Sequence, residues 1–428
     1  MSINHSKLIL GFDGWTLGSH HYQRLVQSLK DSGYRIKLIH FGSYGHDIRQ
    51  QTSEFLGPLE VCDISHYKGK SVREILLEEQ PKAVVFLSTQ SFLHQAVNRY
   101  CQALKIPTLH LFHGFVTVQA VETSQPNKYR FWPQSKLVSQ RAFKNLTKIF
   151  PIYLKSLIET KADILSWLYF FRDVVSKIFG LFQKVASPNC STTFCAVYGL
   201  SDVTYAHNTY RIPIHNIKVV GNPDFIKFRL SDELILSCVS PCSSKTKIIY
   251  IDDGSPTCGL TFASQNDFLN FLVKTKLKLA EQGYELLVKL HPSQAQFDTA
   301  QELIRLGVLL STDASFTSDL LDCRAAITGP SSAAVIPASL GLTLLLAQYD
   351  QFEGQKYGIV YRDYPRSLYL RNLMELKRLL NQETKPDVNR MKMWVQQYLY
   401  PLPAEDMPKR VVEIIDQMVH KHERPCAE

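Results

Sequence analysis

Two histidines and a pair of serines stand in this chain directly after runs of apolar residues. They are His113, His291 and Ser331-Ser332. The carboxyl ends of strands are where open α/β sheets bind ligands. An imidazole can accept a proton or donate a hydrogen bond to a phosphate, and a serine at a helix start can bind phosphate. These residue types predict a group-transfer enzyme, in which a nucleotide-activated donor meets an acceptor that must lose a proton.

The sharpest of these elements is His291-Pro292, because proline pushes the residue before it into extended geometry. The imidazole should then lie at the edge of the sheet and donate to the donor diphosphate. Ser331 and Ser332 follow Gly329-Pro330 and should open a helix whose free amides bind the same diphosphate. Two plainer interpretations stay open: a structural hydrogen bond for the histidine and an ordinary helix cap for the serines.

His113 is the first candidate for the base that deprotonates the acceptor, since histidine titrates near neutral pH. Asp13, at the end of the first predicted strand, is the alternative base, and a structural role for His113 also remains open. The loop after that strand is a plausible part of the acceptor side. Its candidate residues are Gly18, Ser19, His20 and His21.

The sequence Asp252-Asp253-Gly254 has two interpretations. Neighbouring acidic residues can bind a metal or act as a base, but Asp and Gly are equally the residues of a plain turn after a strand. We favour a turn that lines the nucleotide site, with Asp252 or Asp253 contacting donor or acceptor. No further carboxylate cluster supports a metal site, so we expect neither a metal nor a cofactor.

Short apolar strands alternate with amphipathic helices on both sides of a central break, which predicts parallel sheets covered on both faces. The expected strands are 7–12, 35–40, 83–87, 108–112, 193–197, 217–220, 247–251, 285–290, 324–327 and 343–347. The expected helices are 19–31, 72–77, 92–104, 201–209, 262–282, 301–306, 332–340, 366–382, 386–398 and 405–420. The fold class is therefore α/β, with two Rossmann-like domains facing a cleft.

The same pattern predicts the domain organisation. Residues 1–225 form an N-terminal acceptor domain, and residues 128–186 are a helical, basic and aromatic insertion in it. The polar, Ser-rich stretch 226–246 is the best linker candidate. Residues 247–385 form the nucleotide-donor domain, and 386–428 form C-terminal helices.

The chain has 428 residues, 45% of them hydrophobic and 20% charged, as in a globular protein with a large core. Its formal net charge of +9 is concentrated in one segment. Between Lys128 and Lys184 there are eleven Lys or Arg and three acidic residues. This segment is either a membrane-surface element or a set of packed helices with solvated lysines. In the first case Phe170, Phe171 and Phe179 would insert.

Other features narrow the class of protein. No recognition motif accompanies the basic charge, so we do not expect nucleic-acid binding. The nine cysteines include no CxxC pair, which argues against a zinc site or a disulfide framework. The first residues lack a signal-peptide pattern, and no stretch is long and apolar enough to span a bilayer. We therefore expect a cytoplasmic protein, peripheral on the inner face of the plasma membrane if the basic segment binds lipid.

With its elements in this order, the chain resembles GT-B glycosyltransferases that act on bacterial surface polymers. The pattern is similar to that of CDP-glycerol glycerophosphotransferases and the related capsule polysaccharide transferases. The resemblance implies that His113-Gly114 supplies the base and that His291-Pro292 contacts the donor phosphates. It also implies that Ser331-Ser332 bind the same diphosphate and that Gly221-Asn222-Pro223 closes the N-terminal domain.

Bacterial sialyl- and polysialyltransferases are similar in another way, because they share an acidic-acidic-Gly element with Asp252-Asp253-Gly254. Their acidic element lies in the acceptor domain, whereas here it opens the second domain. The resemblance leaves the donor open among CMP-, CDP- and UDP-activated sugars or polyols. The expected activity is transfer to a cell-surface polysaccharide or glycolipid. The alternatives are a nucleotide-sugar epimerase on the same two-domain plan and a non-catalytic glycan-binding scaffold.

Overall fold

A computed structural model gives the structure of the chain for residues 7–14, 18–44, 53–113, 145–179, 186–238, 245–254, 261–262, 264–382 and 387–423. The chain divides into two compact units. Of the described residues, those up to 113, from 145 to 220 and from 406 onward form the first unit, and those from 221 to 405 form the second.

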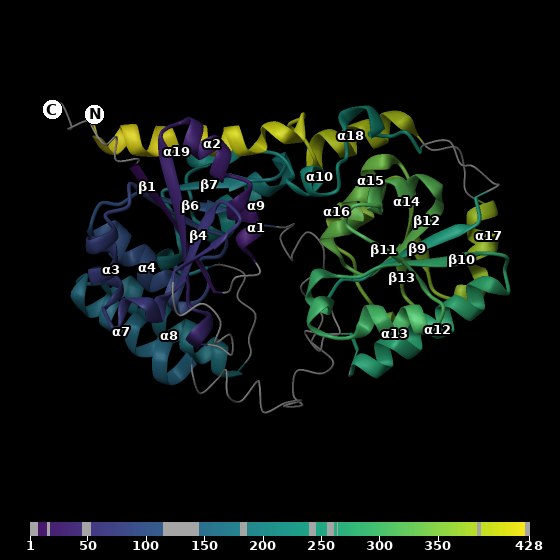
Figure 1. Cartoon of the computed structure of the whole chain (residues 1–428), viewed down its shortest axis with the longest axis horizontal. Coiled ribbons are helices and arrows are strands. Elements are labelled where there is room, and N and C mark those ends of the chain that lie inside the picture. Colours follow the sequence, from purple (N-terminus) through teal and green to yellow (C-terminus); the bar gives the residue numbers. More distant parts are fainter. Residues whose placement is uncertain are drawn as a thin grey trace. The chain divides into compact units, whose positions relative to one another are not determined.

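The first unit is built on an eight-stranded sheet with the order β3-β4-β2-β1-β5-β6-β7-β8 (Figure 1). Its pairings are parallel except that of β3 with β4. The strands are β1 (Lys7–Asp13), β2 (Tyr34–His40), β3 (Glu54–Leu56), β4 (Leu59–Asp63), β5 (Ala83–Phe86), β6 (Thr108–Leu111), β7 (Phe194–Val197) and β8 (Ile217–Val219).

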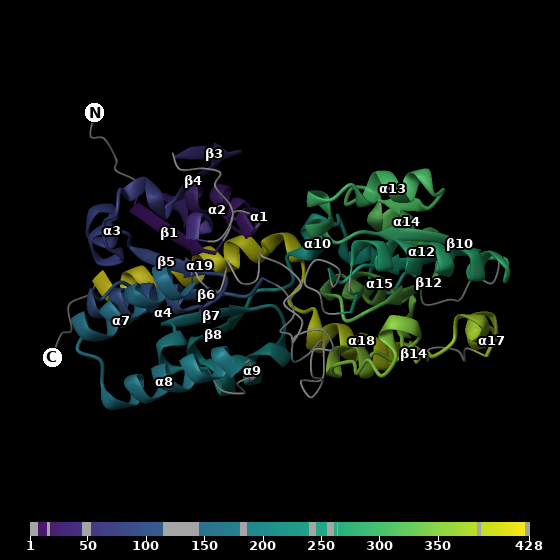
Figure 2. The same ribbon diagram turned by 90° about the horizontal axis from the view of Figure 1, so that it is seen from below.

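Helices cover both faces of this sheet, so successive strand residues such as Ile9 and Leu10 are buried in different cores. The helices are α1 (Ser19–Gln23), α2 (Val26–Asp31), α3 (Val72–Glu79), α4 (Phe92–Ala103), α7 (Phe150–Glu159), α8 (Ile164–Phe179), α9 (Leu200–Tyr210) and α19 (Met407–Glu423). Figure 2 shows α19, the last helix of the chain, lying along the first sheet. Its apolar side chains complete the core on the face that α2 also covers.

The second unit has a six-stranded parallel sheet with the order β11-β10-β9-β12-β13-β14. Its strands are β9 (Lys247–Ile251), β10 (Glu285–Lys289), β11 (Leu309–Ser311), β12 (Cys323–Thr328), β13 (Thr343–Ala347) and β14 (Ser367–Leu370). Because helices lie on both sides, Ile248 and Ile249 are again buried in different cores. Parallel strands covered on both faces are near-continuous apolar runs, which explains why β9, β10, β12 and β13 were predictable.

In Figure 1, α12 and α13 lie on one side of this second sheet, and α14, α15 and α16 lie on the other. The helices of the second unit are α10 (Asp224–Lys227), α12 (Gln265–Ala280), α13 (Thr299–Arg305), α14 (Phe316–Asp322), α15 (Val335–Leu340), α16 (Ile359–Arg362), α17 (Leu376–Asn381) and α18 (Val388–Tyr398).

The structure confirms the α/β class of both halves and differs from the sequence prediction in several elements. The strands β3, β4, β11 and β14 and the helix α14 were not predicted. Three of these strands lie at sheet edges, and short edge strands carry a weak apolar signal. The predicted helix 19–31 is two helices, α1 and α2, and the predicted helix 366–382 begins with the strand β14.

The stretch predicted as a linker, 226–246, differs most, because its described part packs on the second unit. Phe228 and Leu230 are buried in the core of that unit. The backbone amides of Leu236 and Cys238 donate to carbonyls of Ser339 and Leu340. These few anchoring contacts could not be predicted from the composition of the stretch, which is polar and rich in serine. The predicted group of C-terminal helices is also divided, since α18 belongs to the second unit and α19 to the first.

Pro337 lies in the interior of the predicted helix 332–340, where a proline would break the helix. In the structure the chain first forms a 3-10 turn, Ser332–Ala334, and α15 begins only at Val335. Pro337 therefore lies in the first turn of α15, where its missing N–H would have had no partner within the helix.

The predicted insertion is helical where it is described. The segment Asn145–Ile149 forms a π-helical turn and leads into α7 and α8. Residues 128–144 and 180–185 of the insertion lie outside the described residues. Within the described parts of the chain, none of the helices has the length and apolar character needed to cross a bilayer.

Candidate functional site

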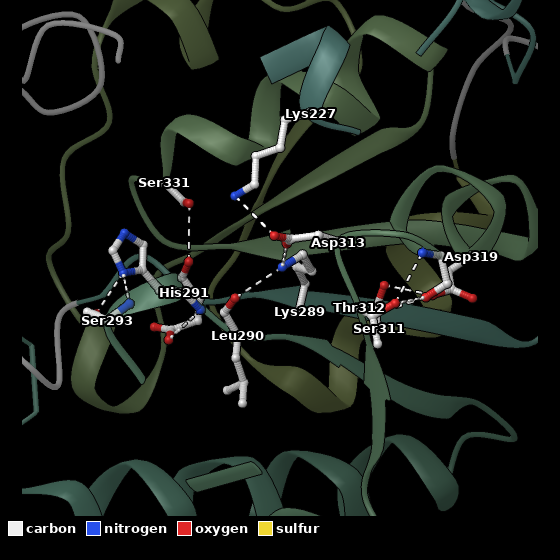
Figure 3. Close-up of polar contacts among 12 residues, drawn as sticks. Lys227, Lys289, Leu290, His291, Ser293, Ser311, Thr312, Asp313, Asp319 and Ser331 are labelled. Atoms are coloured by element: carbon white, nitrogen blue, oxygen red, sulfur yellow. Dashed lines mark hydrogen bonds and ion pairs between the residues drawn. The ribbon is translucent and has the colours of Figure 1, made fainter. Parts of the chain in front are cut away.

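Three neighbouring strands of the second sheet bring the predicted donor-side residues to one edge. Asp252 follows β9, His291 follows β10, and Gly329 follows β12. Because β9 lies between β10 and β12, their carboxyl ends are adjacent. Figure 3 shows the contacts among His291, Ser331 and the residues around them.

Asp252 holds this edge together and is only 2% exposed. Its carboxylate accepts hydrogen bonds from the backbone amides of His291 at 3.1 Å and of Gly254 at 2.9 Å. Burial raises the pKa of Asp252, and these two amides oppose the rise. The carboxylate thus orients the backbone at the ends of β9 and β10.

Two glycines allow the three strand ends to approach closely. A Cβ on Gly254, which has φ +76°, would lie 2.9 Å from Nδ1 of His291. A Cβ on Gly329 would lie 2.6 Å from a carboxylate oxygen of Asp253. Such distances are shorter than van der Waals contact, so neither position can carry a side chain without displacing its neighbour. Because Gly329 has no side chain, there is room for the half-buried Asp253 next to it. In the same way, Gly254 leaves room for the ring of His291.

The hydrogen bonds of His291 determine which ring nitrogen carries the proton. Nδ1 accepts from the backbone amide of Ser293 at 3.1 Å, and an amide N–H can only donate. The proton of the neutral ring is therefore on Nε2. Burial lowers the pKa of His291; Asp253 opposes this, while Lys227 and Lys289 add to it. At neutral pH the ring thus presents a neutral Nε2–H donor.

Ser331 does not form the side-chain hydrogen bond of an ordinary helix cap, the plainer interpretation of the serine pair. Ser331 is buried, makes no cap bond to the following turn, and donates from its hydroxyl to the carbonyl of Asp252 at 3.2 Å. Its own carbonyl accepts from the hydroxyl of Tyr361. Ser331 therefore fixes the end of β12 to the end of β9. Ser332 is half-buried and begins the 3-10 turn that precedes α15.

A charged cluster beside His291 was missed by the sequence analysis. Asp313 accepts from Nζ of Lys289 at 2.7 Å and from Nζ of Lys227 at 3.4 Å, as Figure 3 shows. Burial raises the pKa of Asp313, but the two ammonium groups outweigh it and hold the pKa below its ordinary value. Two cations thus share one carboxylate near the imidazole. Positions 227, 289 and 313 are far apart in the chain, so no local sequence pattern predicts that these residues form a cluster.

The first unit repeats this arrangement with other residues. Asp13 ends β1, Leu87 follows β5, and His113 follows β6. These strands are neighbours in the order β1-β5-β6. The predicted base His113 and the alternative base Asp13 consequently lie at the same edge of one sheet, although they are a hundred residues apart.

His113 is exposed, and its ring is oriented by the backbone. Nδ1 lies 2.8 Å from the carbonyl oxygen of Leu87, which can only accept, so Nδ1 carries the proton. In the neutral ring the lone pair is then on Nε2. His21 lies edge-on to His113 with ring centroids 5.9 Å apart, and His20 lies beside His21 at 3.9 Å. The structure therefore brings the predicted acceptor-side histidines to the candidate base.

Asp13 is less accessible than His113, at 6% exposed. One carboxylate oxygen accepts from the amide of Gly14 at 2.6 Å. The other lies 2.7 Å from where a Cβ of Gly18 would be, so the start of α1 closes over the carboxyl group. Burial raises the pKa of Asp13 to about 7, and the Gly14 amide opposes the rise. These contacts favour a structural role, in which Asp13 holds the backbone of Gly14 beside the start of α1.

His94 also lies in this region and was not singled out by the sequence. Its Nε2 lies 4.0 Å from a carboxylate oxygen of Asp13, and its ring meets those of Phe12, Phe41 and Phe86 edge-on. A histidine inside a helix gives no local sign of such a position. His110, on β6, is buried, and burial lowers its pKa to about 3.

Replacement of Asp13 by Asn should raise the free energy of unfolding near pH 8 and leave it unchanged near pH 4. Because the folded-state pKa of about 7 exceeds the ordinary value of 3.8, the stability of the folded protein falls as the pH rises through this range. At 1.36 kcal/mol per unit, the gain is on the order of 4 kcal/mol. Urea unfolding at both pH values measures it.

Asp298→Asn is the control for this measurement, because Asp298 is exposed and makes no side-chain cap bond. It should show no such pH-dependent gain. An Asp13→Asn variant that is less stable than the parent protein near pH 8 would show instead that the fold requires the ionised carboxylate.

Among the described residues, no group of three or more His, Cys, Asp or Glu side chains could hold a metal ion. Asp252 and Asp253 do not belong to such a group, and neither do the histidines near His113.

Comparisons with known proteins bear on the fold. Neither a protein-family model nor a curated protein sequence matches the chain. The solved structure of the wall teichoic acid polymerase TagF matches with a TM-score of 0.51 and 12% identity, over 98% of this chain and 90% of that chain. A variant of the same polymerase matches with a TM-score of 0.52 at the same identity and coverage.

A UDP-N-acetylglucosamine 2-epimerase from Rickettsia bellii matches with a TM-score of 0.46 and 12% identity, over 99% of both chains. This likeness is too weak to support an argument. The match to the polymerase shows the fold alone: two Rossmann-like α/β domains of the GT-B type.

Proposed function

We propose that this protein transfers a glycosyl or polyol-phosphate group from a nucleotide-activated donor to a hydroxyl of a polysaccharide or glycolipid. The observation that carries the proposal is that two strand-end imidazoles carry their ring protons on different nitrogens. His113 has its lone pair on Nε2, because Nδ1 carries the proton and donates it in a hydrogen bond to the carbonyl of Leu87. His291 has its proton on Nε2, because Nδ1 accepts from Ser293. One ring is set to accept a proton and the other to donate a hydrogen bond.

In the proposed reaction, Nε2 of His113 takes the proton from the acceptor hydroxyl. The acceptor oxygen forms a bond to the electrophilic centre of the donor, and the bond to the nucleotide breaks with its electron pair on the leaving phosphate. The Nε2–H of His291 stabilises that developing negative charge. The positive charges of Lys227 and Lys289 favour an anionic donor near His291.

The remaining predicted site residues are assigned supporting roles. Asp252 and Ser331 position the donor-side strand ends, and Gly329 leaves room for the carboxylate of Asp253. His20 and His21, with Gly18 and Ser19 at the start of α1, form the acceptor side next to His113. We expect no metal to be required, so transfer should persist in the presence of a chelator.

Incubation with a panel of CMP-, CDP- and UDP-activated donors and a glycan acceptor tests the proposal. We expect one nucleotide to be released, only when acceptor is present, together with an enlarged acceptor. The donor class should also stand out in a thermal shift, since a ligand at 100 times its dissociation constant adds roughly 2.7 kcal/mol of stability.

Two other results would contradict the proposal. A free nucleotide sugar that is epimerised without acceptor would assign an epimerase. Saturable glycan binding with no turnover of any donor would assign a glycan-binding scaffold.

A further inference from the structure

The charged cluster beside His291 has its cations inside and its anion outside. The side chains of Lys289 and Lys227 are 9% and 23% exposed, whereas that of Asp313 is 51% exposed. Figure 3 shows both ammonium groups directed at the carboxylate of Asp313. A half-exposed carboxylate can turn into water at little cost, but the inner ammonium group cannot follow it. Asp313 is therefore the member of the cluster that another group can replace.

The buried ammonium group of Lys289 needs an anion next to it. Among the described residues its other close contacts are neutral: Nζ donates to the carbonyl of the next residue at 3.2 Å and lies 5.7 Å from the ring centroids of Phe228 and Phe316. Asp252 also senses the charge of Lys289, but its carboxylate already accepts from two backbone amides. Because an unpaired buried charge is costly, an anion must stay beside Lys289, and Asp313 supplies it.

The backbone that carries Asp313 is held without the help of this carboxylate. Asp313 lies in the turn 312–315, between β11 and α14. The amide of Thr312 donates to the hydroxyl of Ser315 at 3.1 Å, and the amide of Ser315 donates to the hydroxyl of Thr312 at 3.1 Å. In the described part of the chain, the Asp313 carboxylate is held by Lys227 and Lys289 alone. It can consequently leave the lysines while the turn persists.

The two lysines lie within electrostatic range of His291. Lys289 and His291 are two residues apart in extended backbone, so their side chains leave the chain on the same face. The charges of Lys227 and Lys289 both act on the imidazole, since each lowers the pKa of His291. An anionic ligand that accepts from Nε2 of His291 therefore comes close to two cations that Asp313 occupies.

We propose that Asp313 is an exchangeable anion, which occupies Lys227 and Lys289 in the free protein and is replaced by a second anionic group of the bound donor. This group is either the second phosphate of a nucleoside diphosphate or the carboxylate of an acidic sugar on a nucleoside monophosphate. Because the ligand has to displace a carboxylate that is already in place, Asp313 weakens donor binding. The identity of the ligand rests on the proposed function, whereas the exchange itself does not.

Inorganic phosphate, titrated into the full chain at constant ionic strength, tests the exchange. The variant Asp313→Asn can still accept from the ammonium groups but has no charge. Without phosphate it should unfold at a lower temperature than the parent protein, because Lys289 has lost its counter-charge. It should bind phosphate at least about tenfold more tightly than the parent protein does, since no carboxylate competes for the lysines. Calorimetry measures the binding, and the unfolding temperature should rise more steeply with phosphate in the variant.

A second substitution and a control show whether the effect belongs to the lysine pair. Adding Lys227→Gln to Asp313→Asn should remove most of the gain in phosphate affinity. The matched control is Asp322→Asn, which changes a 70% exposed aspartate of α14 that pairs with Lys247 at 3.9 Å. It removes the same charge from the same unit and should bind phosphate as the parent protein does.

Nucleotides distinguish the two sources of the second anionic group. If it is a phosphate, Asp313→Asn should tighten the binding of CDP or UDP about tenfold and leave that of CMP and UMP unchanged. If it is a sugar carboxylate, the gain should appear with CMP-N-acetylneuraminate and be absent with CMP. An equal gain with the monophosphates would contradict the assignment to a second anionic group.

Three results would overturn the exchange. They are an Asp313→Asn variant that binds phosphate no more tightly than the parent protein, an equal gain in Asp322→Asn, and a gain that survives Lys227→Gln. The outcome is independent of the proposed function. Tighter phosphate binding without transfer from any donor would contradict only the transferase, and transfer by a protein in which Asp313→Asn changes no binding would contradict only the exchange.

Discussion

Replacement of His291 by Asn should lower the rate of group transfer by about two to three orders of magnitude, the usual effect of removing a donor that stabilises developing negative charge. The Asn side chain can still accept from the Ser293 amide, as Nδ1 of His291 does, so the turn after β10 should be kept. What it lacks is a donor at the place of Nε2. The measurement is the single-turnover rate with the donor identified by the panel.

Replacement of His291 by Gln separates the two functions of the ring. Its amide reaches farther and can donate from near the place of Nε2, but it gives up the bond to Ser293. If donation to the leaving group is the role of His291, the Gln variant should retain more activity than the Asn variant. The reverse order, with both proteins folded, would show that His291 acts only through the turn that it begins.

Replacement of His113 by Asn should lower transfer by about two to four orders of magnitude, as expected when a general base is lost. The Asn amide can donate to the Leu87 carbonyl, as Nδ1 of His113 does, so the contact that holds this side chain persists. Because His113 is exposed, the free energy of unfolding should change little. The pH profile of kcat/KM should also lose the limb that reports ionisation of the base.

His215→Asn is the control, since His215 is an exposed histidine of the same unit. It should transfer at the parent rate. The variant Asp13→Asn distinguishes the two candidate bases. We expect its rate of transfer to stay within about tenfold of the parent rate, because the base, His113, is still present. An Asp13 variant that is inactive beside an active His113 variant would move the role of base to Asp13.

The sequence alone determined the α/β class and the placing of the main chemical groups at strand ends. Buried parallel strands are continuous apolar runs, so the end of such a run marks the edge of the sheet. His113, His291 and Ser331 could be located in this way before any contact was known. Edge strands such as β3 and β14 escaped, because they are short and only partly buried.

Only the tertiary structure decided what those groups can do. The proton positions of His113 and His291 depend on Leu87, which comes from another strand, and on Ser293, which is placed by the turn at Pro292. The raised pKa of Asp13 depends on burial beneath Gly18. Solvation and hydrogen-bond direction are set by neighbours in space, and the linear order of residues does not specify them.

The basic insertion shows the same division. Its composition predicted either an interaction with anionic lipid or a set of packed helices. The sequence did not determine which face of each helix packs against the rest of the protein. In the structure, Phe170 is buried and the adjacent Phe171 is 58% exposed. Successive residues of a helix point about 100° apart, so which of two neighbouring phenylalanines is buried depends on how α8 is rotated against its anchoring contacts. That rotation is set by the partners of Ser166 and Asp173, which lie on α4 and elsewhere in the first unit.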